Sequence, residues 1–328
     1  MNTRRKILIA LGASALALPL PSPAQGKMWR IGFLAVRPRP ASPEADVYGG
    51  FVQGMRELGY VEGKNFAIDW RFADNKYDRL PGLAAELVKL KVDVIVTAGT
   101  AANTAAQKAT ATIPIVGATM IDPVGSGFAS SLARPRRNIT GLALTTTDMS
   151  PKQLEILKLM LPKMTRVAVL ADLANPGHPD IVSGLETTAQ KMGVKVLPLD
   201  ARNPDDVERA FEAMKREHAE AVIVVLDAFF IGQRRQLAEL ALKNRLPSIY
   251  SAREHVEAGG LMSYGQNLTE FYRRAAGYVD KILKGAKPGE LPIEQVATFS
   301  LTINGKTAKA MGLTIPPELM LRADKVIE

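Results

Sequence analysis

Residues 93–109, DVIVTAGTAANTAAQKA, join a short apolar run to an alanine-rich segment through a glycine and a threonine. Gly99 permits a tight turn, and the hydroxyl of Thr100 and the first amides of a following helix can together bind an anion. Because no Gly-Lys-Ser/Thr follows, the stretch is not a nucleotide P-loop, and a carboxylate is a better candidate than a phosphate. In the simpler alternative, Thr100 only caps its own helix.

A carboxylate in a comparable position, Asp227, follows the apolar run AVIVVL. At the end of a buried strand it could bind an ammonium group, whereas in the simpler alternative it caps the helix that begins in FFIGQRRQL. Other signs of catalysis are weak. The histidines His178, His218 and His255 have no metal-ligand spacing, and the sequence contains no GxSxG segment. We therefore expect neither a metal nor a cofactor.

Short β-rich runs alternate with amphipathic stretches at intervals of about 20–30 residues, the length of one βα unit, and this spacing predicts parallel sheets. Runs such as VIVTAG and AVIVVL are apolar on both faces, which is typical of strands covered by helices on both sides. The predicted strands are 30–36, 65–72, 92–97, 113–118, 139–144, 166–171, 194–199, 221–226, 247–250 and 260–264.

These strands are too numerous for one small doubly wound sheet, and turn-forming residues interrupt the pattern between 122 and 144. We predict an α/β fold with two doubly wound parallel-sheet lobes of about five strands each, joined by a hinge of several strands. Lobe 1 comprises 28–142 plus 267–292, and lobe 2 comprises 143–266 plus 293–328. The helical periodicity of Leu268, Phe271 and Tyr272 assigns their side chains to a core.

In open parallel sheets, ligands bind beyond the carboxyl ends of the strands. Two lobes place two such rims on either side of a cleft, one rich in amide and hydroxyl donors and the other in carboxylates. The candidate ligand-binding residues of lobe 1 are Val36, Arg37, Gly99, Thr100, Ala101, Thr119 and Asp122. Those of lobe 2 are Asp172, Asn175, Asp227, Ser251 and Tyr264.

The start of the chain indicates export. Residues 1–24 have the form of a cleavable signal peptide, with Arg4-Arg5 near the start, an apolar stretch at 7–20, and Ser22-Pro23-Ala24 before the expected cleavage site. We expect a periplasmic protein exported by the Sec route or, given the arginine pair, by the twin-arginine (Tat) route.

The composition narrows the classes of partner. The 328 residues include no cysteine, so neither a disulfide nor a lipid-modified terminus is expected. No later segment has about 18 consecutive apolar residues, so the mature chain is not expected to insert into a membrane. The formal charge is +9, but the basic residues are dispersed, which argues against nucleic-acid binding.

Taken together, several segments resemble the substrate-binding proteins of ABC transporters, in the family that includes tryptophan- and tyrosine-binding members with the type I periplasmic binding fold. The resemblance covers nearly all of the chain after the leader. It is carried by WRIGFLAV, FVQGMRELGYVEGKNFAIDWRFAD, VDVIVTAGTAANTAAQKA, TIPIVGATMIDPVGSGFASSLARP, NITGLAL, REHVEAGGLMSYGQN and TINGKTAKAMGLTIPPELMLRAD.

The resemblance implies a two-lobed cleft without chemistry, in which Thr100 and Ala101 form part of a carboxylate-binding rim. Asp122 resembles the acid of the family's Asp-Pro loop. Asp227 resembles the acid that precedes an asparagine in aromatic-amino-acid binders, and Ala228 stands in the place of that asparagine. Arg136-Arg137 replace a common Gly-Gly pair before Asn138.

We therefore expect a monomeric periplasmic protein that captures a small organic molecule, an amino acid or a related carboxylate, and delivers it to an ABC permease through a transient contact. Two alternatives remain open from the sequence. One is a periplasmic ligand sensor subunit. The other is a periplasmic α/β enzyme that uses Asp227 or Glu254 as a base.

Overall fold

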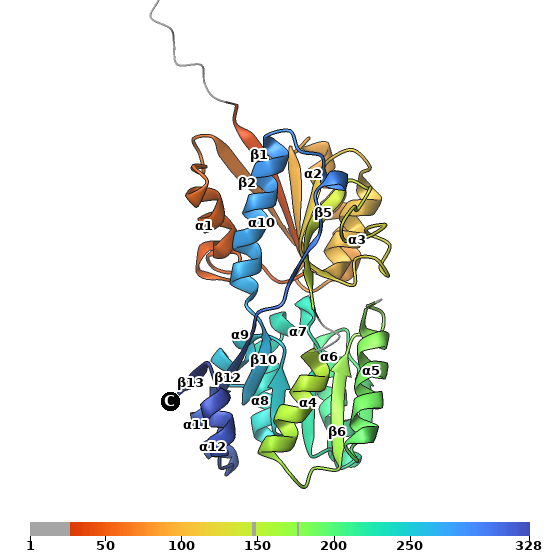
Figure 1. Cartoon of the computed structure of the whole chain (residues 1–328), viewed down its shortest axis with the longest axis vertical. Coiled ribbons are helices and arrows are strands. Elements are labelled where there is room, and N and C mark those ends of the chain that lie inside the picture. The colour runs from red at the N-terminus through yellow and green to blue at the C-terminus, as the bar shows by residue number, and fades with distance from the viewer. Residues whose placement is uncertain (1–26, 146–148, 176) are drawn as a thin grey trace, which may run out of the picture.

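The computed structural model describes residues 27–145, 149–175 and 177–328, and it places two α/β lobes end to end (Figure 1). The predicted signal peptide, 1–24, lies outside the described residues. The two-lobed α/β architecture predicted from the alternating pattern is confirmed. Among the described helices, none is long and apolar enough to cross a membrane.

The first lobe is a six-stranded parallel sheet with the order β11-β5-β4-β3-β1-β2. Its strands are β1 (Trp29–Ala35), β2 (Phe66–Phe72), β3 (Val94–Ala98), β4 (Ile115–Ile121), β5 (Ile139–Leu144) and β11 (Glu294–Val296). Its helices are α1 (Gly49–Glu57), α2 (Leu80–Lys89), α3 (Thr100–Ala109) and α10 (Leu268–Leu283), with 3-10 turns η1 (Pro43–Ala45), η2 (Tyr77–Arg79) and η3 (Pro288–Glu290). The stretch between β4 and β5 contains no helix, as its turn-forming residues predicted.

The second lobe is a seven-stranded sheet with the order β13-β12-β10-β9-β8-β6-β7. Its strands are β6 (Arg166–Ala171), β7 (Lys195–Asp200), β8 (Ala221–Val224), β9 (Ser248–Tyr250), β10 (Met262–Gln266), β12 (Phe299–Asn304) and β13 (Lys325–Ile327). Its helices are α4 (Met149–Met160), α5 (His178–Lys191), α6 (Pro204–Arg216), α7 (Ala228–Gly232), α8 (Arg234–Lys243), α9 (Arg253–Glu257), α11 (Gly305–Met311) and α12 (Pro317–Arg322).

Every predicted strand is present within a few residues, but β11, β12 and β13 were not predicted. Strand β11 pairs with β5, so 294–296 lie in the first sheet and not in the second lobe, to which the sequence analysis assigned 293–328. Strand β12 pairs antiparallel with β10, so the second sheet is mixed and not wholly parallel. A short strand such as β11 carries little periodic signal, because three residues cannot establish an alternation.

Three segments cross between the lobes: one follows β5, one joins β10 to α10, and one joins β11 to β12 (Figure 1). The side chain of Gln266, only 4% exposed, connects all three. Its Oε1 accepts a hydrogen bond from the Thr145 amide (3.1 Å), and its Nε2 donates to the Val296 carbonyl oxygen. The hydroxyl of Thr145 also donates to that carbonyl, at 3.4 Å. The crossings are therefore linked to one another by side-chain hydrogen bonds.

Glycine is required where β4 and β5 approach most closely. Gly141 has a φ of +135°, and a Cβ atom there would lie 2.1 Å from the carbonyl oxygen of Gly117 on β4. The register of this strand pair shifts after Gly117, which is consistent with a local irregularity at that point.

We predict that Gly141→Ala lowers the free energy of unfolding by about 1–3 kcal/mol, because the new methyl group meets backbone and the φ is unfavourable for an L-residue. Gly184→Ala in α5 is the control, since a Cβ there meets nothing within 4 Å; it should be neutral or stabilising by up to about 1 kcal/mol. Urea denaturation followed by circular dichroism measures both. Equal stability of the two variants would contradict the close approach.

Candidate functional site

The carboxyl ends of the parallel strands of the two lobes enclose a cavity of about 40 Å³. About 10–15 Å³ is needed to hold one water molecule, so this inner cavity is small. Eight of the predicted residues line it: Val36, Arg37, Gly99, Thr100, Ala101, Thr119, Asn175 and Asp227. The geometry thus brings strand-end residues of both lobes to one place.

Thr100 does not cap its own helix. Gly99 occupies the N-cap position of α3 with a φ of +96°, and Thr100 is the first helical residue. The Thr100 side chain is buried, the whole residue being 4% exposed, and within the described residues its Oγ1 has no hydrogen-bond partner. Leaving a buried hydroxyl without a partner costs about 1–3 kcal/mol. Because Thr100 also lines the cavity, its hydroxyl is a candidate hydrogen-bonding group for a ligand.

The neighbouring strand fixes the position of this helix start. The amide of Gly99 donates to Thr119 Oγ1 at 3.0 Å, and Asn103 Nδ2 donates to the Thr119 carbonyl at 3.4 Å. Thr97 Oγ1 donates to Asn103 Oδ1. No hydrogen bond to the amide of Thr100 or Ala101 occurs within the described part of the chain. These first-turn amides are therefore available to an acceptor, and the start of a helix favours negative charge.

Arg37 forms a wall of the cavity, but its charge is already paired. The guanidinium, 7% exposed, makes two hydrogen bonds to the Asp46 carboxylate, at 3.1 and 3.0 Å. It also lies 5.4 Å from the ring centre of Tyr48. A bidentate pair of this kind is geometrically strict. Arg37 therefore contributes positive potential near the inner cavity while remaining bound to Asp46.

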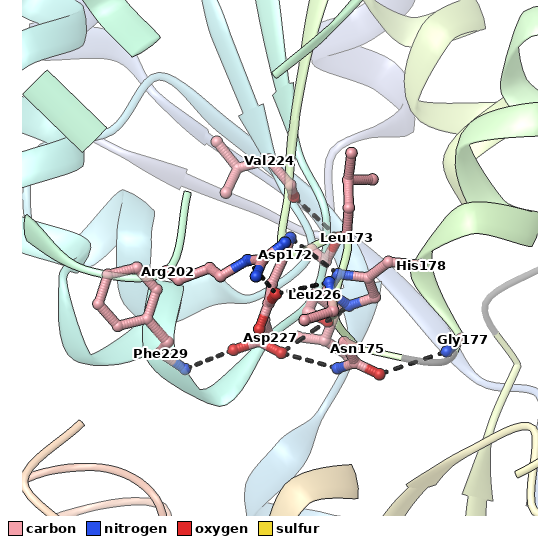
Figure 2. Close-up of polar contacts among 12 residues, drawn as sticks. Asp172, Leu173, Asn175, Gly177, His178, Arg202, Val224, Leu226, Asp227 and Phe229 are labelled. Carbon is pink, nitrogen blue, oxygen red and sulfur yellow. Dashed lines mark hydrogen bonds and ion pairs between the residues drawn. The ribbon is translucent and has the colours of Figure 1, made fainter. Parts of the chain in front are cut away.

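Asp227 is a helix cap and also a contact between the lobes. It occupies the N-cap position of α7, where Oδ1 accepts from the Phe229 amide at 2.7 Å (Figure 2). The same oxygen accepts from the hydroxyl of Tyr77, in the first lobe, at 3.0 Å. Oδ2 accepts from Asn175 Nδ2 at 2.9 Å. Burial and the nearby charges of Asp227 and Asp172 raise the pKa of Tyr77, so its hydroxyl stays protonated and donates.

A buried histidine holds the loop beneath Asp227 (Figure 2). His178 Nδ1 accepts from the Asp172 amide at 3.0 Å, so the proton is on Nε2, which donates to the Leu226 carbonyl at 3.2 Å. Asp172 accepts from the Ala174 amide and lies 3.5 Å from the Arg202 guanidinium. Burial, and secondarily the charge of Asp227, raise the pKa of the Asp172 carboxyl. This network orders the acidic rim of the second lobe.

Four predicted site residues do not line the inner cavity. Asp122 accepts from the Gly125 amide at 2.9 Å within its own loop. Asp172 faces an outer groove adjoining the cavity. Ser251 donates to the Val224 carbonyl at 3.2 Å, and Tyr264 stacks on Phe299 with ring centres 5.5 Å apart. A position at the end of a predicted strand does not distinguish residues that line the cavity from residues that bond to neighbouring strands.

Several cavity residues were missed or assigned only to the core. Leu268 and Tyr272 are buried as predicted, but they also line the cavity. Tyr272 packs against Tyr48, another lining residue, with ring centres 5.0 Å apart. Tyr77 follows two residues in the left-handed region, Asp74 and Asn75, in a turn that no periodic pattern marks. The other unpredicted lining residues are Ala98, Ile121, Leu144, Leu226, Ala228 and Ile231.

The two bases considered for an enzyme do not meet at one site. Asp227 is committed to three hydrogen bonds, with Phe229, Tyr77 and Asn175. Glu254 lies on α9 and faces a separate, charged groove. Burial raises the pKa of the Glu254 carboxyl.

Comparison with known proteins identifies binding proteins. Residues 41–327 match the profile of the family described as ABC transporter substrate binding protein. A tyrosine-binding protein of Clostridioides difficile (strain R20291) is 26% identical over 265 residues, which cover 80% of this chain and 76% of that protein.

Two solved structures show the same fold. The complex of an ABC domain from Streptococcus pneumonia with L-Trp has a TM-score of 0.83 at 23% identity, covering 92% of this chain and all of that one. The ligand-free, open structure of a Clostridium difficile substrate binding protein with adhesive properties has a TM-score of 0.64 at 25% identity, covering 92% of this chain and 99% of that one.

We predict that Thr100→Val leaves the free energy of unfolding unchanged or raises it by up to about 1 kcal/mol, because it removes a buried hydroxyl for which the described residues offer no partner. Thr97→Val is the matched control at the same strand–helix junction. It removes a partnered hydroxyl and leaves Asn103 Oδ1 unsatisfied, so it should cost about 1–3 kcal/mol. Chemical denaturation compares the two. A loss of 1 kcal/mol or more in Thr100→Val would mean that the hydroxyl has a partner within the protein.

Proposed function

Because this chain belongs to the family of ABC transporter substrate-binding proteins, we propose that it captures a small organic solute in the periplasm and delivers it to an ABC importer. The proposed solute is an amino acid or a related carboxylate. The observation that carries this proposal is the inner cavity, which residues of both lobes line, among them Thr100, whose hydroxyl has no partner in the part of the chain that the structure describes. The family and the tyrosine-binding relative are binding proteins and not enzymes.

The first-lobe rim suits the anionic end of such a solute. The amides that begin α3 carry partial positive charge, and Thr100 adds a hydroxyl donor beside them. The guanidinium of Arg37 supports negative charge at the same rim although it is bound to Asp46. A carboxylate placed between these groups would satisfy the buried hydroxyl, and this gain offsets part of the solute's desolvation.

The second-lobe rim suits a donor group. The Oδ1 atom of Asp227 accepts a hydrogen bond from the hydroxyl of Tyr77 in the first lobe. An ammonium group could take the place of that hydroxyl, because a charge-assisted hydrogen bond is stronger than one from a neutral donor. The two rims would then distinguish the two ends of an amino acid.

The arrangement of the lobes corresponds to a closed form. The Tyr77–Asp227 hydrogen bond joins the lobes directly, and a Cβ on Gly99 would lie 3.3 Å from Cβ of Ala228 in the other lobe. The higher TM-score to the ligand complex than to the open relative supports this interpretation. In the proposed cycle, solute binding closes the lobes at the three crossings, and a permease binds the closed monomer transiently.

We predict that Tyr77→Phe shifts the protein toward an open form about 10- to 100-fold, because a hydrogen bond to a carboxylate contributes about 1.5–3 kcal/mol. The chain has no cysteine, so Lys89→Cys and Glu186→Cys, on exposed sites of α2 and α5, provide the only thiols for spin labels. Double electron–electron resonance then measures the distance between the lobes.

Tyr60→Phe is the matched control for Tyr77→Phe. It also loses a 3.0 Å hydrogen bond to an aspartate, Asp280, but both residues lie in the first lobe. The control should leave the distance distribution unchanged. Identical distributions in Tyr77→Phe and in the parent protein would show that this bond does not stabilise closure.

The proposed function is tested by identifying the solute. A specific solute at a hundred times its dissociation constant should raise stability by about 2.7 kcal/mol and be recovered chemically unchanged. We predict that Asp227→Asn weakens L-tyrosine binding about 10- to 100-fold relative to binding of 3-(4-hydroxyphenyl)propanoate, which lacks the ammonium group. Isothermal titration calorimetry compares the two compounds. Equal weakening of both would assign Asp227 to its capping role alone, and turnover of the solute would overturn the binding function.

A further inference from the structure

A second depression, the outer groove, adjoins the inner cavity on the side of α3. It has a volume of about 340 Å³ and lies between α3 and the turn η2 of the first lobe and the loop that follows β6 in the second. Its walls are mostly apolar, formed by Leu80, Pro81, Ala105 and Ala174. The positions that α3 contributes, from Thr100 through Thr104 to Lys108, recur at helical spacing and so form one face of that helix.

The outer groove borders the inner cavity. The two share four lining residues: Tyr77, Thr100, Ala101 and Asn175. Tyr77 borders both spaces, and its hydroxyl is bound to Asp227 on the opposite lobe. The ring of Tyr77 therefore lies at the border between a small space and a larger apolar one.

The two spaces differ in the part of a solute that each can hold. The inner cavity, at about 40 Å³, has room for a group the size of a carboxylate and borders the hydroxyl of Thr100. The outer groove is several times larger and mostly apolar. Its charged residues are Lys108, which is exposed, and Asp172, which is buried and bound to its own loop. An uncharged body of several carbons therefore fits the groove best.

We propose that the solute is a carboxylate with an extended apolar body, whose carboxylate end occupies the inner cavity at Thr100 and whose body lies in the outer groove along α3. This inference rests on the proposed solute-binding function and deepens it. Tyr77 is then a specificity-determining residue, because its ring lies where the body must pass from one space into the other.

The test uses two series of probes that differ only in length: acetate, butanoate and hexanoate, and the corresponding glycine, 2-aminobutanoate and norleucine. Each methylene buried in the groove should strengthen binding about fourfold, so the six-carbon probe of the preferred series should bind about 15-fold more tightly than its four-carbon member. Ligand-detected nuclear magnetic resonance measures the affinities. Using both series keeps the result independent of whether Asp227 binds an ammonium group.

Filling the groove should remove this gain. Ala174→Phe places a ring in the groove from an exposed position of the second lobe, and Thr104→Phe places one there from α3. Two variants are used so that the test remains possible if one of them fails to fold. In both variants the two-carbon probe should bind as before, while the advantage of the six-carbon probe should fall at least tenfold. Ala85→Phe, on an exposed part of α2 outside the groove, is the control and should keep the full dependence on length.

The outcomes separate the two hypotheses. An equal dependence on length in the groove variants and in the parent protein would overturn the placement of the body in the outer groove. Affinity that does not rise with length, or the absence of binding by every probe, would overturn the proposed solute class. Recovery of an unchanged co-purified solute of another class would then still support the solute-binding function, whereas turnover would overturn both.

Discussion

The side-chain amide of Gln266 fixes how the two lobes face each other. It lies on one crossing, accepts from the amide of Thr145 on another, and donates to the carbonyl of Val296 on the third. A buried amide needs partners for both its oxygen and its nitrogen. These two hydrogen bonds link all three crossings to one another. The strand ends of both sheets are therefore held at the same place, and a cavity forms between them.

The two rims that meet there differ in chemistry for reasons set within each lobe. In the first lobe, Gly99 turns the chain tightly enough that Thr100 begins α3 without capping it, and among the described residues its hydroxyl has no hydrogen-bond partner. In the second lobe, Asp227 is held by its own helix and by Asn175, above the buried His178. A donor rim therefore opposes an acceptor rim, and Tyr77 connects the two.

This division gives the proposed solute its orientation. The positive end of the α3 dipole and the paired Arg37 favour an anion on one side, while the carboxylate of Asp227 favours a donor on the other. In the proposed binding mode, the small inner cavity would hold the carboxylate and the outer groove would hold the rest of the solute. In this proposal, closure at the crossings and recognition of the solute would depend on the same contacts between the lobes.

The sequence by itself determined the succession of the first ten strands, the presence of two lobes, and the position of the Gly99–Thr100 turn and of Asp227 at strand ends. These features are local, because apolar runs, helix periodicity and glycine turns each involve neighbouring residues. It could not determine that β11 returns to the first sheet or that β12 runs antiparallel to β10, since pairing partners are chosen by packing. Only the tertiary structure decided whether the Thr100 hydroxyl has a hydrogen-bond partner among the described residues. It also decided that the Tyr77 hydroxyl donates to Asp227, 150 positions later in the chain. Such contacts arise where the strand ends of the two lobes meet, and no local sequence pattern predicts which residues meet there.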